Sequence, residues 1–375
     1  MNSILMLGGV VFAVACRDSG TAPGMPDPDD HGTLIWEADG ASLIAPVVVD
    51  TMLVAVHGNR VVAHERRTGR MLWEQPVGNT IARAERLLHT SGVIIVPYHT
   101  LYGLDARNGA IRWTYGSSGE VGKLSPAVAG DTVFVANDPL GSVSALDART
   151  GATLWSRSVA MTVYAPVIAG QLVIYPIRVA GEGNDVLLAL DRRTGVERWR
   201  QSLAGSGAYA DDMTMWGAGV SSDGVIVSTV LGRLLAFRLS DGSPLWQTTL
   251  SSPNTPRIAG PPLIFDGQIV LSGGPDTLES RSLQDGRLLW KTSLDAVVSR
   301  PPTRCGSYLC VSDRLLWILD RTGKIIWTEG DGPGFQFMSA VTVDGEGIMY
   351  VHLALPELRA VVRAFRPPVR LGSSP

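Results

Sequence analysis

Short apolar runs alternate with turn residues along almost the whole chain. The stretches APVVVDTMLVAV (45–56), PAVAGDTVFVA (126–136), APVIAGQLVIY (165–175) and PPLIFDGQIVL (261–271) each consist of one apolar run, two turn residues and a second apolar run. This pattern is typical of a β-hairpin. No segment keeps the 3.6-residue spacing of an amphipathic helix. The pattern therefore predicts an all-β protein built from short antiparallel strands.

One motif recurs seven times, and ALDRRTGVERW (189–199) is a clear copy of it. The copies occupy residues 63–73, 103–113, 145–155, 189–199, 236–246, 280–290 and 318–327. In every copy a glycine stands four residues before a tryptophan. The glycines are Gly69, Gly109, Gly151, Gly195, Gly242, Gly286 and Gly323. The tryptophans are Trp73, Trp113, Trp155, Trp199, Trp246, Trp290 and Trp327, and Trp36 precedes the series. The period of about forty residues equals one four-stranded propeller blade.

Each part of the motif has a physical role in such a blade. The aspartate and threonine can bond to backbone N–H groups of the turn, and the glycine can adopt the positive φ that a tight hairpin needs. A tryptophan buries roughly 150 to 250 Å², worth about 4 to 6 kcal/mol as an upper bound. Its indole N–H needs an acceptor, which the backbone of a neighbouring blade could supply. We therefore interpret the tryptophan as the contact that docks one blade onto the next.

Counting strands predicts how the propeller closes. Trp36 has no strands of its own before it, while residues 338–366 offer three strands without the motif. Together they would form an eighth blade, which removes the open edge of the sheet array. We expect an eight-bladed β-propeller of four-stranded antiparallel blades, with the N-terminal strand completing the last blade. The expected organisation is a signal peptide (1–15), a tether (16–31), the propeller (32–366) and a tail (367–375).

The first residues of the chain suggest export. Residues 1–15 are uncharged and mostly apolar but too few to span a bilayer, and a polar, proline-rich segment follows them. The sequence AVAC (13–16) resembles a bacterial lipobox, which would make Cys16 the lipidated first residue of the mature chain. Arg17 after that cysteine is similar to the pattern of outer-membrane lipoproteins, so we expect the periplasmic face of the outer membrane. The alternative is a simple signal peptide with an incidental cysteine.

Composition excludes some functions and leaves a few candidate residues. The net charge of −3 gives no basic field for nucleic acid, and 45% hydrophobic residues suffice for a large core. The six histidines, at 31, 57, 64, 89, 99 and 352, lack the spacing of a metal site, and we expect His57 and His99 on strands or at strand ends. Cys305 and Cys310 flank a two-residue turn, so either a disulfide or two buried thiols would fit.

The stretch between residues 205 and 219 is the longest connection between blades. It contains Tyr209, Asp211, Asp212, Met213, Met215 and Trp216, and Trp216 lies outside the docking series. Loops on a rigid scaffold commonly carry binding residues. The alternative is a loop that folds over its own aromatic residue to plug one end of the ring. A calcium site at Asp211 and Asp212 is a weaker interpretation.

The motif resembles the docking motif of the pyrroloquinoline-quinone-type propeller repeat, A-x-D-x-x-T-G-x-x-x-W. The copies at 145–155 and 189–199 match every defined position, and the resemblance covers about residues 32–366. WD40 repeats fit less well because no repeat tryptophan is followed by aspartate. The resemblance implies one of two classes: quinoprotein dehydrogenases with a calcium-bound quinone, or non-enzymatic relatives such as the lipoprotein of the β-barrel assembly machine.

The sequence favours the second class. The dehydrogenases carry two adjacent cysteines against the cofactor, and this chain has no such pair and no C-x-x-C-H haem motif. We expect a non-catalytic, lipid-anchored scaffold without a cofactor, acting as a monomer within a complex. Its expected partner is an envelope protein, the candidate being the outer-membrane barrel assembly protein. The alternatives are a degenerate quinoprotein that binds a small ligand, or the quinone with calcium, at the centre of the ring, and an envelope sensor domain.

Overall fold

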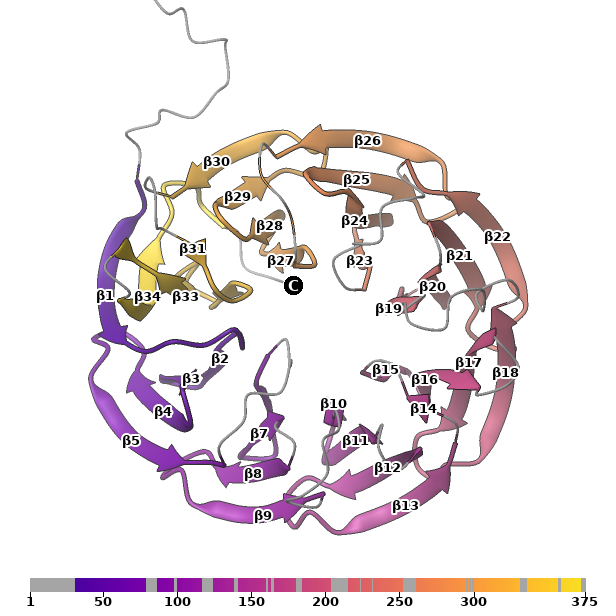
Figure 1. Cartoon of the computed structure of the whole chain (residues 1–375), viewed down its shortest axis with the longest axis horizontal. Helices are drawn as coiled ribbons and strands as arrows, with labels where there is room; N and C mark the ends of the chain where they lie inside the picture. Colours follow the sequence, from indigo (N-terminus) through magenta and orange to yellow (C-terminus); the bar gives the residue numbers. More distant parts are fainter. Residues whose placement is uncertain are drawn as a thin grey trace, which may run out of the picture.

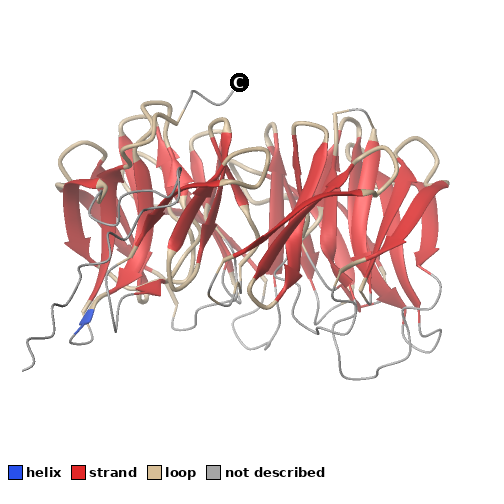
Figure 2. Ribbon diagram, turned by 90° about the horizontal axis from the view of Figure 1, so that it is seen from above, coloured by secondary structure: helices blue, strands red, loops and turns tan. Residues whose placement is uncertain are grey.

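The computed structural model describes residues 31–371 except for 79–85, 98–99, 117–123, 138–140, 160, 163–164, 180–183, 204–214, 223, 231, 252–260, 295, 297, 299, 331–335 and 357–358. The described strands form eight separate antiparallel sheets, arranged side by side around a ring (Figure 1). From the side, the strands stand upright and short turns join them at both faces of the ring (Figure 2).

Seven sheets are built from consecutive strands and are called blades 1 to 7. Blade 1 contains β2 (Val47–Val49), β3 (Met52–His57), β4 (Arg60–Glu65) and β5 (Met71–Pro76). Blade 2 contains β6 (Leu88–Thr90), β7 (Val93–Pro97), β8 (Leu101–Asp105) and β9 (Ile111–Tyr115). Blade 3 contains β10 (Leu124–Ala129), β11 (Thr132–Asn137), β12 (Ser142–Asp147) and β13 (Thr153–Ser158). Blade 4 contains β14 (Met161–Thr162), β15 (Val167–Ala169), β16 (Leu172–Val179), β17 (Asn184–Asp191) and β18 (Glu197–Leu203).

The second half of the ring repeats this order from the inner to the outer strand. Blade 5 contains β19 (Met215–Val220), β20 (Val225–Val230), β21 (Arg233–Arg238) and β22 (Pro244–Thr249). Blade 6 contains β23 (Leu263–Phe265), β24 (Gln268–Gly274), β25 (Thr277–Ser282) and β26 (Leu288–Ser293). Blade 7 contains β27 (Thr303–Cys305), β28 (Tyr308–Ser312), β29 (Leu316–Leu319) and β30 (Ile325–Glu329).

The remaining sheet joins the two ends of the chain and is called the composite sheet. It contains β31 (Gln336–Phe337), β32 (Thr342–Val343), β33 (Met349–Ala354) and β34 (Ala360–Arg366), with β1 (Thr33–Asp39) as its outer strand. In Figure 1 the indigo β1 lies beside the yellow β34. The two strands pair antiparallel from Thr33 opposite Arg366 to Asp39 opposite Val361.

The expectation of eight uniform four-stranded blades needs correction. Only seven sheets are contiguous blades, and blade 4 and the composite sheet each have five strands. In blade 4 the inner position is split, because β16 is eight residues long and pairs with β15 and then with β14. In the composite sheet β33 likewise pairs with both β31 and β32. The inner edge of these sheets is therefore interrupted.

The hydrophobic core lies between the sheets. The buried residues form eight clusters, and each cluster joins two neighbouring sheets. The third strand of blade 1, β4, has four consecutive buried residues, whereas the outer strand β5 alternates between exposed and partly buried positions. A middle strand is packed on both faces, so its sequence is continuously apolar. Burial between sheets thus explains the apolar runs of the sequence.

Candidate functional site

The repeated turn is held by its aspartate. In blade 4, Oδ1 of Asp191 accepts hydrogen bonds from the backbone N–H of Arg193 and Thr194 and from Oγ1 of Thr194, each at 3.1 Å. The side-chain hydrogen bond from Arg198 is the largest of several that lower the pKa of Asp191, to about 2. The Gly195 N–H closes the turn on the Asp191 carbonyl at 2.8 Å. The aspartate and threonine of the motif therefore shape the turn.

Each repeat tryptophan docks on the turn of the next sheet along the chain. Trp155 of blade 3 donates its Nε1–H to the Arg192 carbonyl of blade 4 at 3.0 Å, and Trp36 of the composite sheet donates to the Arg66 carbonyl of blade 1 at 2.8 Å. The same donation is made by Trp73, Trp113, Trp199, Trp246 and Trp290. Trp327 is buried between blade 7 and the composite sheet.

The motif glycine receives the ring of the preceding tryptophan. A Cβ added to Gly195 would lie 2.7 Å from Cδ2 of Trp155, and one added to Gly69 would lie 2.6 Å from Cδ2 of Trp36. All seven motif glycines have positive φ, from 68° at Gly195 to 82° at Gly323. The glycine and tryptophan of one repeat therefore act at two different interfaces, which explains their joint recurrence.

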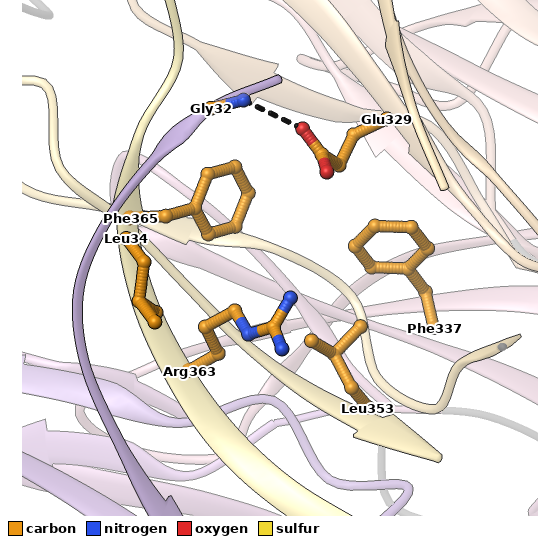
Figure 3. Close-up of a pocket in the computed structure, with 7 residues that line it drawn as sticks. All are labelled: Gly32, Leu34, Glu329, Phe337, Leu353, Arg363 and Phe365. Atoms are coloured by element: carbon orange, nitrogen blue, oxygen red, sulfur yellow. Dashed lines mark hydrogen bonds between the residues drawn. The ribbon is translucent and has the colours of Figure 1, made fainter. Parts of the chain in front are cut away.

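The N-terminal segment is fixed to blade 7 as it enters β1. Gly32 donates its N–H to Oε2 of Glu329 at 2.8 Å, and Nδ1 of His31 lies 3.5 Å from Oε1 of the same carboxylate. Beside this contact is a cavity of about 20 Å³, which has room for about one water molecule. It is lined by Gly32, Leu34, Glu329, Phe337, Leu353, Arg363 and Phe365 (Figure 3). A cavity of this size excludes an organic cofactor.

A cluster of three histidines lies where the composite sheet packs on blade 1. The ring centroid of His57 lies 5.3 Å from that of His64 and 6.0 Å from that of His352. The His64 side chain is 3% exposed and His352 is fully buried. Sequence reasoning missed this cluster, because His352 is almost 300 residues away from the other two. The three histidines come together only because the composite sheet packs on blade 1.

Burial dominates the electrostatics of the cluster. It lowers the pKa of His57 to about 4, helped by the neighbouring His64 and opposed by Asp39. It lowers the pKa of His352 to about 3, helped by His57 and His64. The pKa of His64 is also lowered by burial, against a raising contribution from the Gly69 carbonyl, which lies 2.9 Å from Nδ1. All three rings are therefore neutral at pH 7.

The residues expected to bind lie mostly outside the described part of the chain. Tyr209, Asp211, Asp212, Met213, His99 and the expected lipidation site Cys16 are among the residues that are not described. Met215 and Trp216 begin β19, the inner strand of blade 5, and His57 ends β3. Within the described ranges, no group of three or more histidine, cysteine or acidic residues could hold a metal ion. The same ranges contain no helix long and apolar enough to cross a membrane.

Cys305 and Cys310 form a disulfide within blade 7, with a Cα–Cα distance of 5.9 Å. Cys305 pairs with Tyr308 and Cys310 pairs with Thr303, so the two cysteines lie diagonally across the hairpin. Both are buried in the cluster that joins blade 7 to the composite sheet. Of the two arrangements that the sequence left open, the structure contains the disulfide.

Curated proteins that are similar to this chain include an assembly factor and a hydrolase. The chain is 25% identical over 329 residues to outer membrane protein assembly factor BamB of Yersinia pestis, covering 79% of this chain and 77% of the relative. It is 23% identical over 356 residues to tetrathionate hydrolase of Acidithiobacillus ferrooxidans, covering 80% of this chain and 69% of the relative.

Solved structures share the fold at lower identity. BamB of Moraxella catarrhalis matches with a TM-score of 0.65 at 18% identity, covering 90% of this chain and 98% of that one. A europium-containing methanol dehydrogenase matches with a TM-score of 0.64 at 12% identity, covering 89% of this chain and 93% of that one. The fold alone is thus common to an assembly factor and an enzyme.

The match to a family model favours the assembly factor over the enzyme. The model described as outer membrane protein assembly factor BamB matches residues 26–182, 182–278 and 254–364, so its matches extend over all the sheets of the ring. The chain is therefore a propeller of the pyrroloquinoline-quinone type and belongs to the BamB family.

Proposed function

We propose that this protein is a non-catalytic interaction scaffold in the assembly of outer-membrane proteins, held by a lipid anchor at Cys16 on the periplasmic face of the outer membrane. The observation that carries the proposal is the family match, which extends from residue 26 to residue 364. The arrangement of the motif supports it, because the described aspartate and threonine residues of the repeat serve turns and the tryptophans serve sheet docking. The partner is an outer-membrane barrel assembly protein.

A crosslinked pull-down from membranes tests the proposal. The full chain carrying a C-terminal affinity tag is expressed in its native host, crosslinked in intact cells and purified from detergent-solubilised membranes. The expected result is recovery of a β-barrel assembly protein in amounts comparable to the bait. A matched Cys16→Ser variant should lose membrane association while still folding. Recovery of the bait without a barrel partner would contradict the scaffold role.

A second candidate function is binding of a small ligand at the centre of the ring, favoured by the similarity to a tetrathionate hydrolase over 80% of this chain. Thermal unfolding of the purified protein with pyrroloquinoline quinone and calcium, and separately with tetrathionate, distinguishes this function from the scaffold. A ligand that binds the folded state raises the unfolding temperature by mass action. The scaffold proposal expects no shift with either addition.

A further inference from the structure

The composite sheet is joined to blade 1 by contacts that depend on charge. Below the three-histidine cluster of His57, His64 and His352, the Arg66 guanidinium of blade 1 lies 2.7 Å from Glu346 and 3.4 Å from Asp344. The Tyr350 hydroxyl donates to the other side of this network, to Asp344 at 2.9 Å. We call the contact between the composite sheet and blade 1 the seam. It is the place where the two ends of the chain are held against the rest of the ring.

The repeats show that the histidines of the seam are departures from an apolar pattern. His64 follows the motif alanine, and the same position holds Leu104, Leu146, Leu190, Phe237, Arg281 and Leu319 in the other blades. Tyr350 pairs with Ala364 of the composite sheet, and His352 lies two residues after Tyr350. At the corresponding position the seven other sheets have Val56, Pro97, Ala136, Pro176, Thr229, Ser272 and Ser312. Except for Arg281 in blade 6, the other sheets therefore fill these two positions with residues that carry no titratable group.

The cluster has little that would stabilise a positive charge. Nε2 of His57, Nε2 of His64 and both ring nitrogens of His352 are buried without a hydrogen-bond partner among the described residues. The backbone carbonyls of Val56 and Ile44 lie toward the His352 ring and oppose the effect of burial only in part. Gly40 packs on His57 so closely that an added Cβ would lie 2.5 Å from its Cδ2 atom. These four ring nitrogens are therefore shielded from water that would solvate a protonated ring.

The charged groups around the cluster are few, and they do not neutralise it. Asp39 of β1 opposes the lowering of the His57 pKa, but its side chain is 84% exposed and already lies 3.3 Å from Arg359. The remaining charged or titratable groups of the seam are Arg66, Arg67, Asp344, Glu346 and Tyr350. A hydrogen bond from Arg67 lowers the pKa of Glu346, so this carboxylate stays ionised in mild acid. The histidines are then the groups of the seam that change charge between neutral and mildly acidic pH.

We propose that the three-histidine cluster makes the seam an acid-sensitive latch: when the rings take up protons, the composite sheet separates from blade 1, and the contact that Trp36 of β1 makes with the Arg66 carbonyl is lost. The direction follows from proton linkage. A histidine whose pKa in the folded state is below the ordinary 6.5 binds fewer protons folded than open. The closed seam is therefore fully stable above about pH 6.5 and loses stability as the pH falls toward the folded-state value. Three positive charges within contact distance also repel one another.

Hydrogen exchange of the full chain at several pH values tests the latch. After correction for intrinsic exchange rates, protection of the amides of β1, β3 and β33 should fall by more than about thirtyfold between about pH 7 and about pH 5, since one such site alone gives about thirtyfold and the cluster has three. Amides of β17 in blade 4 and of β21 and β22 in blade 5, on the opposite side of the ring (Figure 1), should keep their protection. Equal loss in all sheets, or no loss in the seam, would overturn the proposal.

Matched variants identify the responsible residues. The double variant His64→Leu with His352→Val uses residues that occupy the same positions in other blades, and its seam should lose no more than about thirtyfold of its protection at about pH 5, because only His57 remains to take up a proton. The control is His89→Leu, because His89 is partly buried on β6 of blade 2 and lies outside the cluster. This control should open in acid like the unchanged chain. A double variant that opens in acid as much as the unchanged chain would refute the assignment.

Nuclear magnetic resonance of the unchanged chain keeps the proposal testable if the double variant fails to fold. Histidine ring signals of the cluster should stay in the neutral form while the seam is closed and should become protonated only together with the loss of β1 amide dispersion. Ring signals that titrate near pH 6.5 with β1 unchanged would show that the charge is tolerated, and the latch would be excluded.

Discussion

At the scale of single residues, the glycine of each repeat has two separate constraints. One is the positive φ of the turn, which other turn glycines such as Gly170 share. The other is the tryptophan ring of the preceding sheet, which leaves no room for a Cβ at the motif glycines. Blade 4 contains both kinds of position. Gly170 has a φ of 57° and nothing within 4 Å of its added Cβ, while Gly195 has a φ of 68° and the Trp155 ring at 2.7 Å.

This pair allows the two constraints to be measured separately. Gly170→Ala should cost about 1 kcal/mol of unfolding free energy, from backbone strain alone. Gly195→Ala should cost about 2 to 4 kcal/mol, because the methyl group also displaces the docked indole. Denaturant unfolding of both variants beside the unchanged protein gives the difference. Equal costs would mean that the tryptophan moves aside freely and that its docking contributes little.

Residue-scale reasoning from the sequence succeeded where the repeat itself supplied the information. The invariant step between glycine and tryptophan predicted a docking contact, and the structure shows which atoms make it. The sequence could not show that the ring contacts the glycine of the following repeat instead of its own. His64 and His352 could not be joined either, because each looks like an isolated histidine until the strand register is known.

At the scale of elements, blade 7 differs from the others in its inner hairpin. Its strands β27 and β28 are linked by the disulfide between Cys305 and Cys310, and both sulfurs lie in the cluster that packs on the composite sheet. A disulfide across so short a loop stabilises by about 2 kcal/mol in the chain-entropy description. The spacing of the two cysteines suggested the bond but left buried thiols open, because hairpin register decides which side chains meet.

Removing this bond should therefore weaken blade 7 without unfolding the ring. In the double variant Cys305→Ala with Cys310→Ala, we expect a loss of about 2 to 4 kcal/mol, which combines the chain-entropy contribution with two small core cavities. The free energy of unfolding in denaturant, compared with that of the unchanged chain kept oxidised, measures it. The control is the unchanged chain with a reductant, which separates the bond from the cavities. A reduced chain as stable as the oxidised one would show that the disulfide does not stabilise the fold.

At the scale of the whole molecule, the sheets depend on one another around the ring, and the composite sheet depends on both ends of the chain. The pattern of motifs predicted that the N-terminal strand would join the C-terminal strands, and β1 does pair with β34. The sequence did not predict the split inner strands of blade 4 and the composite sheet. In both sheets two short inner strands pair with one longer strand. The periodicity of the sequence does not indicate where such short strands end.

The contribution of β1 can be isolated by two truncations. Removing residues 1–31 leaves β1 in place and costs the exposed contact between His31 and Glu329, so we expect the free energy of unfolding of this truncation to stay within about 1 kcal/mol of that of the full chain. Removing residues 1–39 also deletes Trp36, its bond to the Arg66 carbonyl and the whole pairing with β34. Loss of a buried tryptophan alone costs about 3 to 5 kcal/mol, and the exposed edge of β34 becomes a template for pairing between molecules.

The longer truncation should therefore unfold at clearly lower denaturant and elute as oligomers in size-exclusion chromatography, while the shorter one stays monomeric. Adding a synthetic peptide of residues 32–40 to the longer truncation should restore part of the stability, because the peptide supplies the missing outer strand. If the two truncations were equally stable and equally monomeric, β1 would contribute nothing to holding the seam closed. The stability of the longer truncation thus decides whether the fold requires the pairing of β1 with β34.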